Sequence, residues 1–161
     1  TTGMPAVSTI QFTQDQARTL TGVSVETVRH WRKAIPYLAA KTGKTARFTY
    51  TDLVALAVTN ALVSSLGAHI AALSGGVDAL FRLLATVGPT SLDGAIVVVT
   101  ATDASLYEPV ADGISRLSSA PALTVPLAPL VANIQRHMLP IVPVSPQVAL
   151  PFPPKAVRSR A

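Results

Sequence analysis

Two short helices joined by a glycine turn are the feature that most restricts the fold of this chain. Thr13-Gln14-Asp15-Gln16 has the capping-box pattern, in which the Thr13 hydroxyl accepts a hydrogen bond at the helix N-terminus and the Gln16 amide bonds back to the backbone there. The pattern predicts a helix that begins at Gln14 and ends at Leu20. Gly22 then supplies a turn, because it takes a positive φ at low steric cost.

A second helix is predicted directly after that turn. Ser24 is a suitable N-cap for a helix over residues 25–33, because its hydroxyl can accept from the free amides of the first turn. Basic residues follow at the C-terminal end of this segment, where the negative end of the helix dipole favours them. Two short helices joined by a three- or four-residue turn that contains glycine are the signature of a helix-turn-helix.

The two faces of this second helix differ in character. Spacings of three and four residues predict that Val25, Val28 and either Trp31 or Arg32 face the core, against Ala17 and Leu20 of the first helix. A polar, net basic outer face suits insertion into the major groove of DNA, where side chains read base edges. The alternative is a helix that is merely exposed to solvent. The outer face contains Glu26, Thr27, Arg29, His30 and Lys33.

Positive charge is concentrated near the start of the chain. The formal net charge is +5, and residues 1–50 contain seven Lys or Arg and two Asp or Glu, so this segment accounts for all of the excess. Neutralising phosphates releases condensed counterions, so a basic segment is typical of a nucleic-acid-binding surface. An ordinary solvated basic face is the alternative on charge alone.

Residues 41–50 read as a β-hairpin with Gly43 near its tip. Such a hairpin would form a wing beside the helix-turn-helix. Lys44 and Arg47 are then candidates for phosphate or minor-groove contacts. Phe48 and Tyr50 are expected to anchor the hairpin to the core.

The order and spacing of these pieces resemble the MerR family of transcription regulators over residues 10–75. The resemblance rests on Gln16-Ala17, Thr21-Gly22-Val23-Ser24, Thr27-Val28-Arg29-His30-Trp31, Arg47-Phe48-Thr49, Asp52-Leu53 and Leu66-Gly67.

The resemblance implies a winged helix-turn-helix that binds double-stranded DNA as a homodimer. It implies DNA contacts from Arg29, His30 and Arg47, and contact with RNA polymerase, without indicating a particular small-molecule effector. Two departures stand out. The segment Ala34-Ile35-Pro36-Tyr37 lacks the family's usual Gly-Leu step, and no long heptad helix follows the fourth helix, so the family's coiled-coil dimer does not carry over directly.

The segment from Leu53 to Val77 contains no charged residue, so a membrane span has to be weighed against buried helices. Small and polar residues and glycines interrupt it, which favours separate helices in a protein that is not inserted in a membrane. Thr51 is expected to cap a third, fully buried helix from Asp52, followed by short helices over 68–73 and 77–85. An apolar surface of this size predicts a homodimer. Coverage by the C-terminal half is the alternative.

The C-terminal half changes character and is expected to be a small mixed α/β part. Residues 95–100 form a β-branched apolar run that reads as a buried strand, and Leu123–Val125 reads as an edge strand or a loop among prolines. Residues 130–138 suit a final helix. From residue 139 onward prolines recur and the chain ends basic, which predicts an extended arm.

Composition argues against several function classes. The chain contains no Cys, and its histidines, His30, His69 and His137, are far apart in sequence, so no metal site is expected. No nucleophile elbow, phosphate-binding loop or paired carboxylates are present, so neither a catalytic residue nor a cofactor is expected and the protein is predicted not to be an enzyme.

The sequence therefore predicts a mainly α chain with a β-hairpin wing, an α/β C-terminal part and a Pro-rich tail. We expect a DNA-binding domain over 10–75, a dimerisation or effector region over 76–138 and a basic tail over 139–161. The predicted function is a bacterial, cytoplasmic, nucleoid-associated transcription regulator that binds a pseudo-palindromic operator as a homodimer. An architectural, recombination-associated or packaging-associated DNA-binding protein and, more weakly, a protein-interaction module are alternatives. The predicted DNA-binding residues are Thr13, Ser24, Glu26, Thr27, Arg29, His30, Lys33, Lys44 and Arg47.

Overall fold

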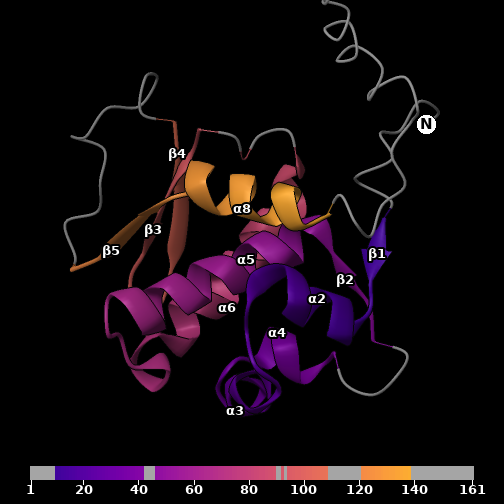
Figure 1. Cartoon of the computed structure of the whole chain (residues 1–161). Helices are drawn as coiled ribbons and strands as arrows, with labels where there is room; N and C mark the ends of the chain where they lie inside the picture. The colour runs from indigo at the N-terminus through magenta and orange to yellow at the C-terminus, as the bar shows by residue number, and fades with distance from the viewer. Residues whose placement is uncertain (1–9, 42–45, 90–91, 93, 109–120, 139–161) are drawn as a thin grey trace, which may run out of the picture.

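The computed structural model describes residues 10–41, 46–89, 92, 94–108 and 121–138 (Figure 1). Most of the described chain is helical, with two small antiparallel sheets. The elements, in chain order, are β1 (Gln11–Phe12), α2 (Gln14–Thr21), α3 (Val25–Ala34), α4 (Pro36–Ala39), β2 (Phe48–Thr49), α5 (Tyr50–Asn60), the π-helix η1 (Ala61–Ser65), α6 (Ile70–Val87), β3 (Ile96–Val99), β4 (Ala104–Tyr107), β5 (Leu123–Pro126) and α8 (Ala128–Met138).

The helix-turn-helix forms as the sequence predicts. The Thr13 side chain accepts from the Gln16 backbone amide, and the Gln16 side chain accepts from the Thr13 amide, so the capping box is complete. Gly22 ends α2 with a φ of 79°, and the Ser24 side chain accepts from the Thr27 amide to begin α3. One expectation was wrong: Val25 is 38% exposed and does not face the core. It occupies the first position of α3.

The strand that follows has a different partner from the one expected. β2 pairs antiparallel with β1, so Phe48 lies opposite Phe12 and Thr49 opposite Gln11. Strand β2 therefore pairs with β1 and not within the hairpin predicted over residues 41–50. Residues 42–45, which include the expected tip at Gly43, lie outside the described residues. Both rings expected to be anchors are buried, because pairing with β1 directs Phe48, at 1% exposed, and then Tyr50, at 4%, into the core.

Helix α5 begins two residues earlier than predicted. Thr49, not Thr51, is the N-cap: its side chain accepts from the Asp52 amide, and the Asp52 carboxylate accepts from the Thr49 amide. A Thr with an acidic residue three positions later completes a capping box, which Thr51 cannot do because Val54 occupies that position. All residues from 50 to 59 are buried, as the apolar pattern predicts. The π-helix η1 extends α5 before the chain turns at Gly67, whose φ is 70°.

The two helices predicted over 68–73 and 77–85 are one helix, α6. Gly75 and Gly76 do not break it, since they lie where the turn between β3 and β4 packs against α6. A Cβ on Gly76 would come within 1.9 Å of the Thr100 carbonyl oxygen, and the Gly76 amide donates to the Ala101 carbonyl at 3.0 Å. The glycines therefore permit a close approach of two backbones, which periodicity alone does not reveal.

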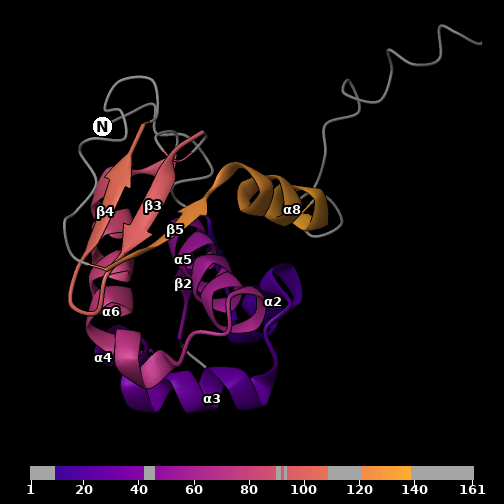
Figure 2. The same cartoon turned by 90° about the vertical axis from the view of Figure 1, so that its left-hand side faces the viewer.

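The C-terminal elements cover the buried helices. The three-stranded sheet has the order β4-β3-β5, with β5 at the edge as expected, and it packs against α6 on one side (Figure 2). Strand β4 was not anticipated. Helix α8 lies across α5 and α2 (Figure 1). The C-terminal half therefore covers α5, which was the alternative to a homodimer. The apolar surface of α5 is then no argument for a dimer.

A single hydrophobic core includes residues from α2 through α8. The boundary expected between the DNA-binding domain and the dimerisation or effector region, between residues 75 and 76, lies inside α6. Helix α6 is also the one helix among the described residues that is long and apolar enough to cross a membrane, although a third of that window is buried against the rest of the protein. Length and composition of this kind also occur in core helices.

Candidate nucleic-acid interface

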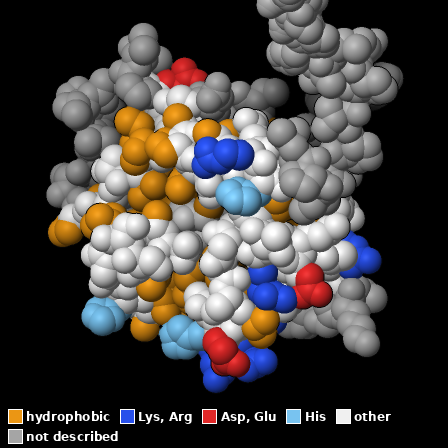
Figure 3. Space-filling view, in the orientation of Figure 1, with side chains coloured by type: hydrophobic (Ala, Val, Ile, Leu, Met, Phe, Trp, Pro, Cys, Tyr) orange, Lys and Arg blue, Asp and Glu red, His pale blue; other side chains and the backbone are white. Residues whose placement is uncertain are grey.

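Helix α3 presents one side to the core and the other to solvent. Val28 and Trp31 are 2% and 1% exposed, and they pack in the common core with Ala17 and Leu20 of α2. In both views α3 lies at the lower end of the molecule (Figures 1 and 2). Figure 3 shows basic, acidic and His side chains gathered at this end. Because the buried stripe fixes the rotation of α3, its outer face has a defined orientation.

The outer face contains an ion pair. The Arg29 Nη1 lies 2.8 Å from the Glu26 Oε2, three residues earlier, and the two side chains are 60% and 80% exposed. An exposed pair of this kind contributes little to stability, on the order of 0.2–1 kcal/mol. The pair places the Arg29 guanidinium beside Glu26 in the free protein, and its small contribution to stability means that Arg29 can be released to another acceptor at little cost.

The remaining predicted residues on or beside α3 divide into exposed side chains and side chains with local hydrogen-bond partners. His30 and Lys33 are exposed. Thr27 is half-buried, and its hydroxyl oxygen accepts from the Ser24 hydroxyl at 2.8 Å. Ser24 and Thr13 are engaged in capping α3 and α2, so their hydroxyls have local structural partners.

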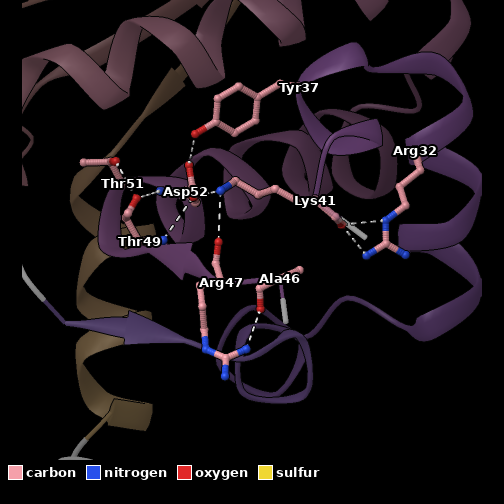
Figure 4. A network of polar contacts seen from close by, with 8 residues as sticks. All are labelled: Arg32, Tyr37, Lys41, Ala46, Arg47, Thr49, Thr51 and Asp52. Atoms are coloured by element: carbon pink, nitrogen blue, oxygen red, sulfur yellow. Dashed lines mark hydrogen bonds and ion pairs between the residues drawn. The ribbon is translucent and has the colours of Figure 1, made fainter. Parts of the chain in front are cut away.

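The two residues expected on the wing are less alike. Arg47 is exposed directly before β2, and its Nη1 donates to the Ala46 carbonyl at 2.9 Å (Figure 4). Lys44 lies outside the described residues. Of the two residues expected on the wing, the structure therefore places only Arg47.

Arg32 is a residue whose role sequence reasoning missed. Its Nε and Nη2 both donate to the Lys41 carbonyl, at 3.1 and 2.9 Å, and Nη2 also donates to the Gln14 side chain. Burial, and then the like charge of Arg29, lower the pKa of the Arg32 guanidinium. The side chain joins the end of α3 to the start of α2 and to the segment after α4. Its position at the margin of the apolar stripe was the available signal.

Asp52 is the centre of a second polar network (Figure 4). Its Oδ1 accepts from the Tyr37 hydroxyl at 2.7 Å, and its Oδ2 accepts from the Thr49 amide at 3.0 Å and lies 3.5 Å from the Lys41 Nζ. The carboxylate is almost completely buried, at 1% exposed. Burial first, and then the hydrogen bond to Asp52, raise the pKa of the Tyr37 hydroxyl, which therefore stays protonated as the donor.

Tyr37 also connects this network to α6. Its backbone amide donates to the Asp78 Oδ1 at 2.7 Å, so Asp78 caps the short helix α4. Its ring stacks on Phe81 with the centroids 5.0 Å apart, and the Arg82 guanidinium lies 5.6 Å from the ring centroid. Tyr37 therefore joins three elements that are far apart in sequence.

The part of the chain that the structure describes contains no cluster of metal ligands. There, no three His, Asp or Glu side chains are close enough together to hold a metal ion. The described arrangement is a solvent-facing helix with an exposed ion pair between Arg29 and Glu26, packed on a partly buried network of polar contacts.

One comparison with known proteins supports this arrangement. Residues 12–79 match the family model described as MerR HTH family regulatory protein. The match extends from β1 into α6 and so includes α2, α3, β2 and α5. No curated protein and no solved structure matches the chain.

Proposed function

We propose that this protein is a sequence-specific transcription regulator that binds a pseudo-palindromic DNA operator as a homodimer, because residues 12–79 match the family model described as MerR HTH family regulatory protein. This likeness supports DNA binding and a regulatory rather than an enzymatic role. The operator, the dimer and the contacting residues belong to the proposal. So do a bacterial cytoplasm and nucleoid as the place of action, and contact with RNA polymerase.

The observation that carries the proposal is the division of α3 into a buried and a polar face. Val28 and Trp31 hold the helix, and Arg29, His30 and Lys33 remain exposed on its other side. An α-helix fits the major groove, and Arg there binds the N7 and O6 acceptors of guanine with two hydrogen bonds. The proposed contact exchanges one acceptor of Arg29 for another: Glu26 in the free protein, and a base in the complex.

A homodimer follows from how such helices read DNA. One α3 covers only a few base pairs, and two copies related by a twofold axis can reach successive major grooves about 34 Å apart. Arg47 of each copy would then bind the flanking backbone. The dimer is proposed on these grounds and on family likeness. The apolar surface of α5 does not support it, because α8 covers that surface.

Selection from a randomised duplex pool tests the proposal. The selected duplex and a scrambled control are titrated at about 150 mM salt, because affinities depend steeply on salt, with the wild type, Arg29→Ala and Arg136→Ala. Arg136 is an exposed Arg on α8 that donates to Asn133, so its removal matches the charge change. We expect Arg29→Ala to weaken binding to the selected duplex by a factor of about 5–150, which corresponds to about 1–3 kcal/mol, and Arg136→Ala to leave it unchanged.

The other outcomes separate the alternatives. Salt-sensitive binding to every duplex without enrichment would favour an architectural, recombination or packaging role. Equal losses on selected and scrambled DNA would remove Arg29 from base readout. No binding to any duplex would overturn the proposal and direct attention to an acidic protein partner.

A further inference from the structure

Lys41 belongs to the basic N-terminal segment, but its side chain points inward. Its Nζ donates to the Arg47 carbonyl at 2.9 Å and lies 3.5 Å from the Asp52 Oδ2 (Figure 4). The same ammonium lies 5.5 Å from the Tyr37 ring centroid and 5.7 Å from that of Phe48. A phosphate contact would require the ammonium to leave a buried carboxylate, a carbonyl and two ring faces, so Lys41 is poorly placed to bind DNA directly.

We propose that Lys41 is a positioning residue, which fixes the backbone of Arg47 relative to α3 and so determines where Arg47 meets DNA. The carbonyl of Lys41 accepts twice from Arg32 at the end of α3, and its ammonium donates to the carbonyl of Arg47. One residue thus joins the proposed reading helix to the proposed backbone contact. The part of the inference that concerns DNA rests on the proposed function.

The other end of this connection is anchored in the core. Asp52 is buried at the start of α5 and accepts from the Tyr37 hydroxyl, and Tyr37 is held to α6 by Asp78 and Phe81. Charge-assisted hydrogen bonds in a buried setting are stronger and more directional than exposed ones. The Lys41 ammonium therefore has a rigid reference, which a flexible surface lysine lacks.

The first experiment needs no DNA. Amide hydrogen exchange is compared in the wild type, Lys41→Met and Lys33→Met. Methionine keeps an apolar stem against Tyr37 and Phe48, and Lys33 is an exposed lysine of α3. We expect Lys41→Met to speed exchange of the Phe48 and Thr49 amides by about tenfold, in line with the loss of a hydrogen bond to a charged group. Unchanged exchange at these amides would overturn the positioning role.

The second experiment measures DNA binding in a double-mutant cycle. If Lys41 acts through Arg47, Lys41→Met lowers affinity for the selected duplex about tenfold, and adding it to Arg47→Ala has little further effect, since coupled residues are not additive. Additive losses, with each variant lowering the salt slope by about 0.9, would make Lys41 an independent phosphate contact and overturn the inference.

Tyr37→Phe gives a variant that loses no charge. It removes only the hydroxyl that Asp52 binds and keeps the ring stacked on Phe81. We expect reduced affinity that is non-additive with Lys41→Met, and wild-type affinity in Tyr37→Phe would contradict the anchoring by Asp52. If the wild type binds no duplex, the proposed function fails, while the exchange experiment still decides whether Lys41 holds the Arg47 segment.

Discussion

The protein contains two helix pairs that are built in opposite ways. The outer pair, α2 and α3, turns at Gly22, and each helix begins at a side-chain cap supplied by the adjacent residue. The inner pair, α5 and α6, turns at Gly67 and packs against segments from both ends of the described chain. The outer pair buries one stripe, whereas every residue of α5 from 50 to 59 is buried.

This difference separates the tasks of the two pairs. A helix held by one stripe keeps a free polar face for a partner, and its local caps fix its ends without using that face. A helix buried on all sides supplies rigidity and has no surface left for recognition. Helix α5, packed against α6, is therefore the scaffold, and the polar network around Asp52 and Tyr37 connects it to the outer part.

The largest expected effect is on the inner pair. Leu56 of α5 is 1% exposed, and Leu56→Ala should lower the free energy of unfolding by about 2–5 kcal/mol, because it removes buried methyl groups and leaves a cavity. Val25→Ala on α3 is the matched apolar control, with Val25 at 38% exposed, and should cost within about 0.5 kcal/mol. Urea unfolding measures both. Similar losses would mean that the two pairs are not built differently.

A second effect tests the close approach of the β3–β4 turn to α6. Gly76→Ala places a Cβ against the Thr100 carbonyl, and overpacking of this kind should cost about 1–3 kcal/mol in spite of the better helix propensity of alanine. At Gly75 a Cβ would lie 3.0 Å from the Ala101 carbonyl, so Gly75→Ala should cost less. The same urea titration compares them. A stabilised Gly76→Ala variant would show that the turn does not lie against α6.

The smallest effect concerns the caps. Ser24→Ala removes the acceptor for the Thr27 amide and should cost about 1 kcal/mol. His69 stands at the extended N-cap of α6 and makes no side-chain cap hydrogen bond, so His69→Ser should raise stability by a few tenths to about 1 kcal/mol. Thermal unfolding resolves shifts of this size. If His69→Ser lowered stability as much as Ser24→Ala, the His69 side chain would contribute to α6 in some other way.

Much of the candidate site could be predicted because its signals are short-range. The faces of α3 follow from spacings of three and four residues, and Arg29, His30 and Lys33 are exposed as expected. The roles of Arg32 and Lys41 could not be predicted in full, because each depends on an acceptor in another segment: Lys41 for Arg32, and Asp52 and Arg47 for Lys41. In the sequence Lys41 is simply a member of a basic segment, and only the position of Arg32 at the margin of the apolar stripe sets it apart.

The sequence by itself determined the two capped helices of the outer pair, the burial of α5 and the strand at β3, since caps, periodicity and β-branched runs act over a few residues. Only the tertiary structure decided that β2 pairs with β1, that α6 continues through Gly75 and Gly76, and that α8 covers α5. Each of these depends on contacts between segments far apart in the chain. Their free energy comes from burial and backbone pairing that no local pattern encodes.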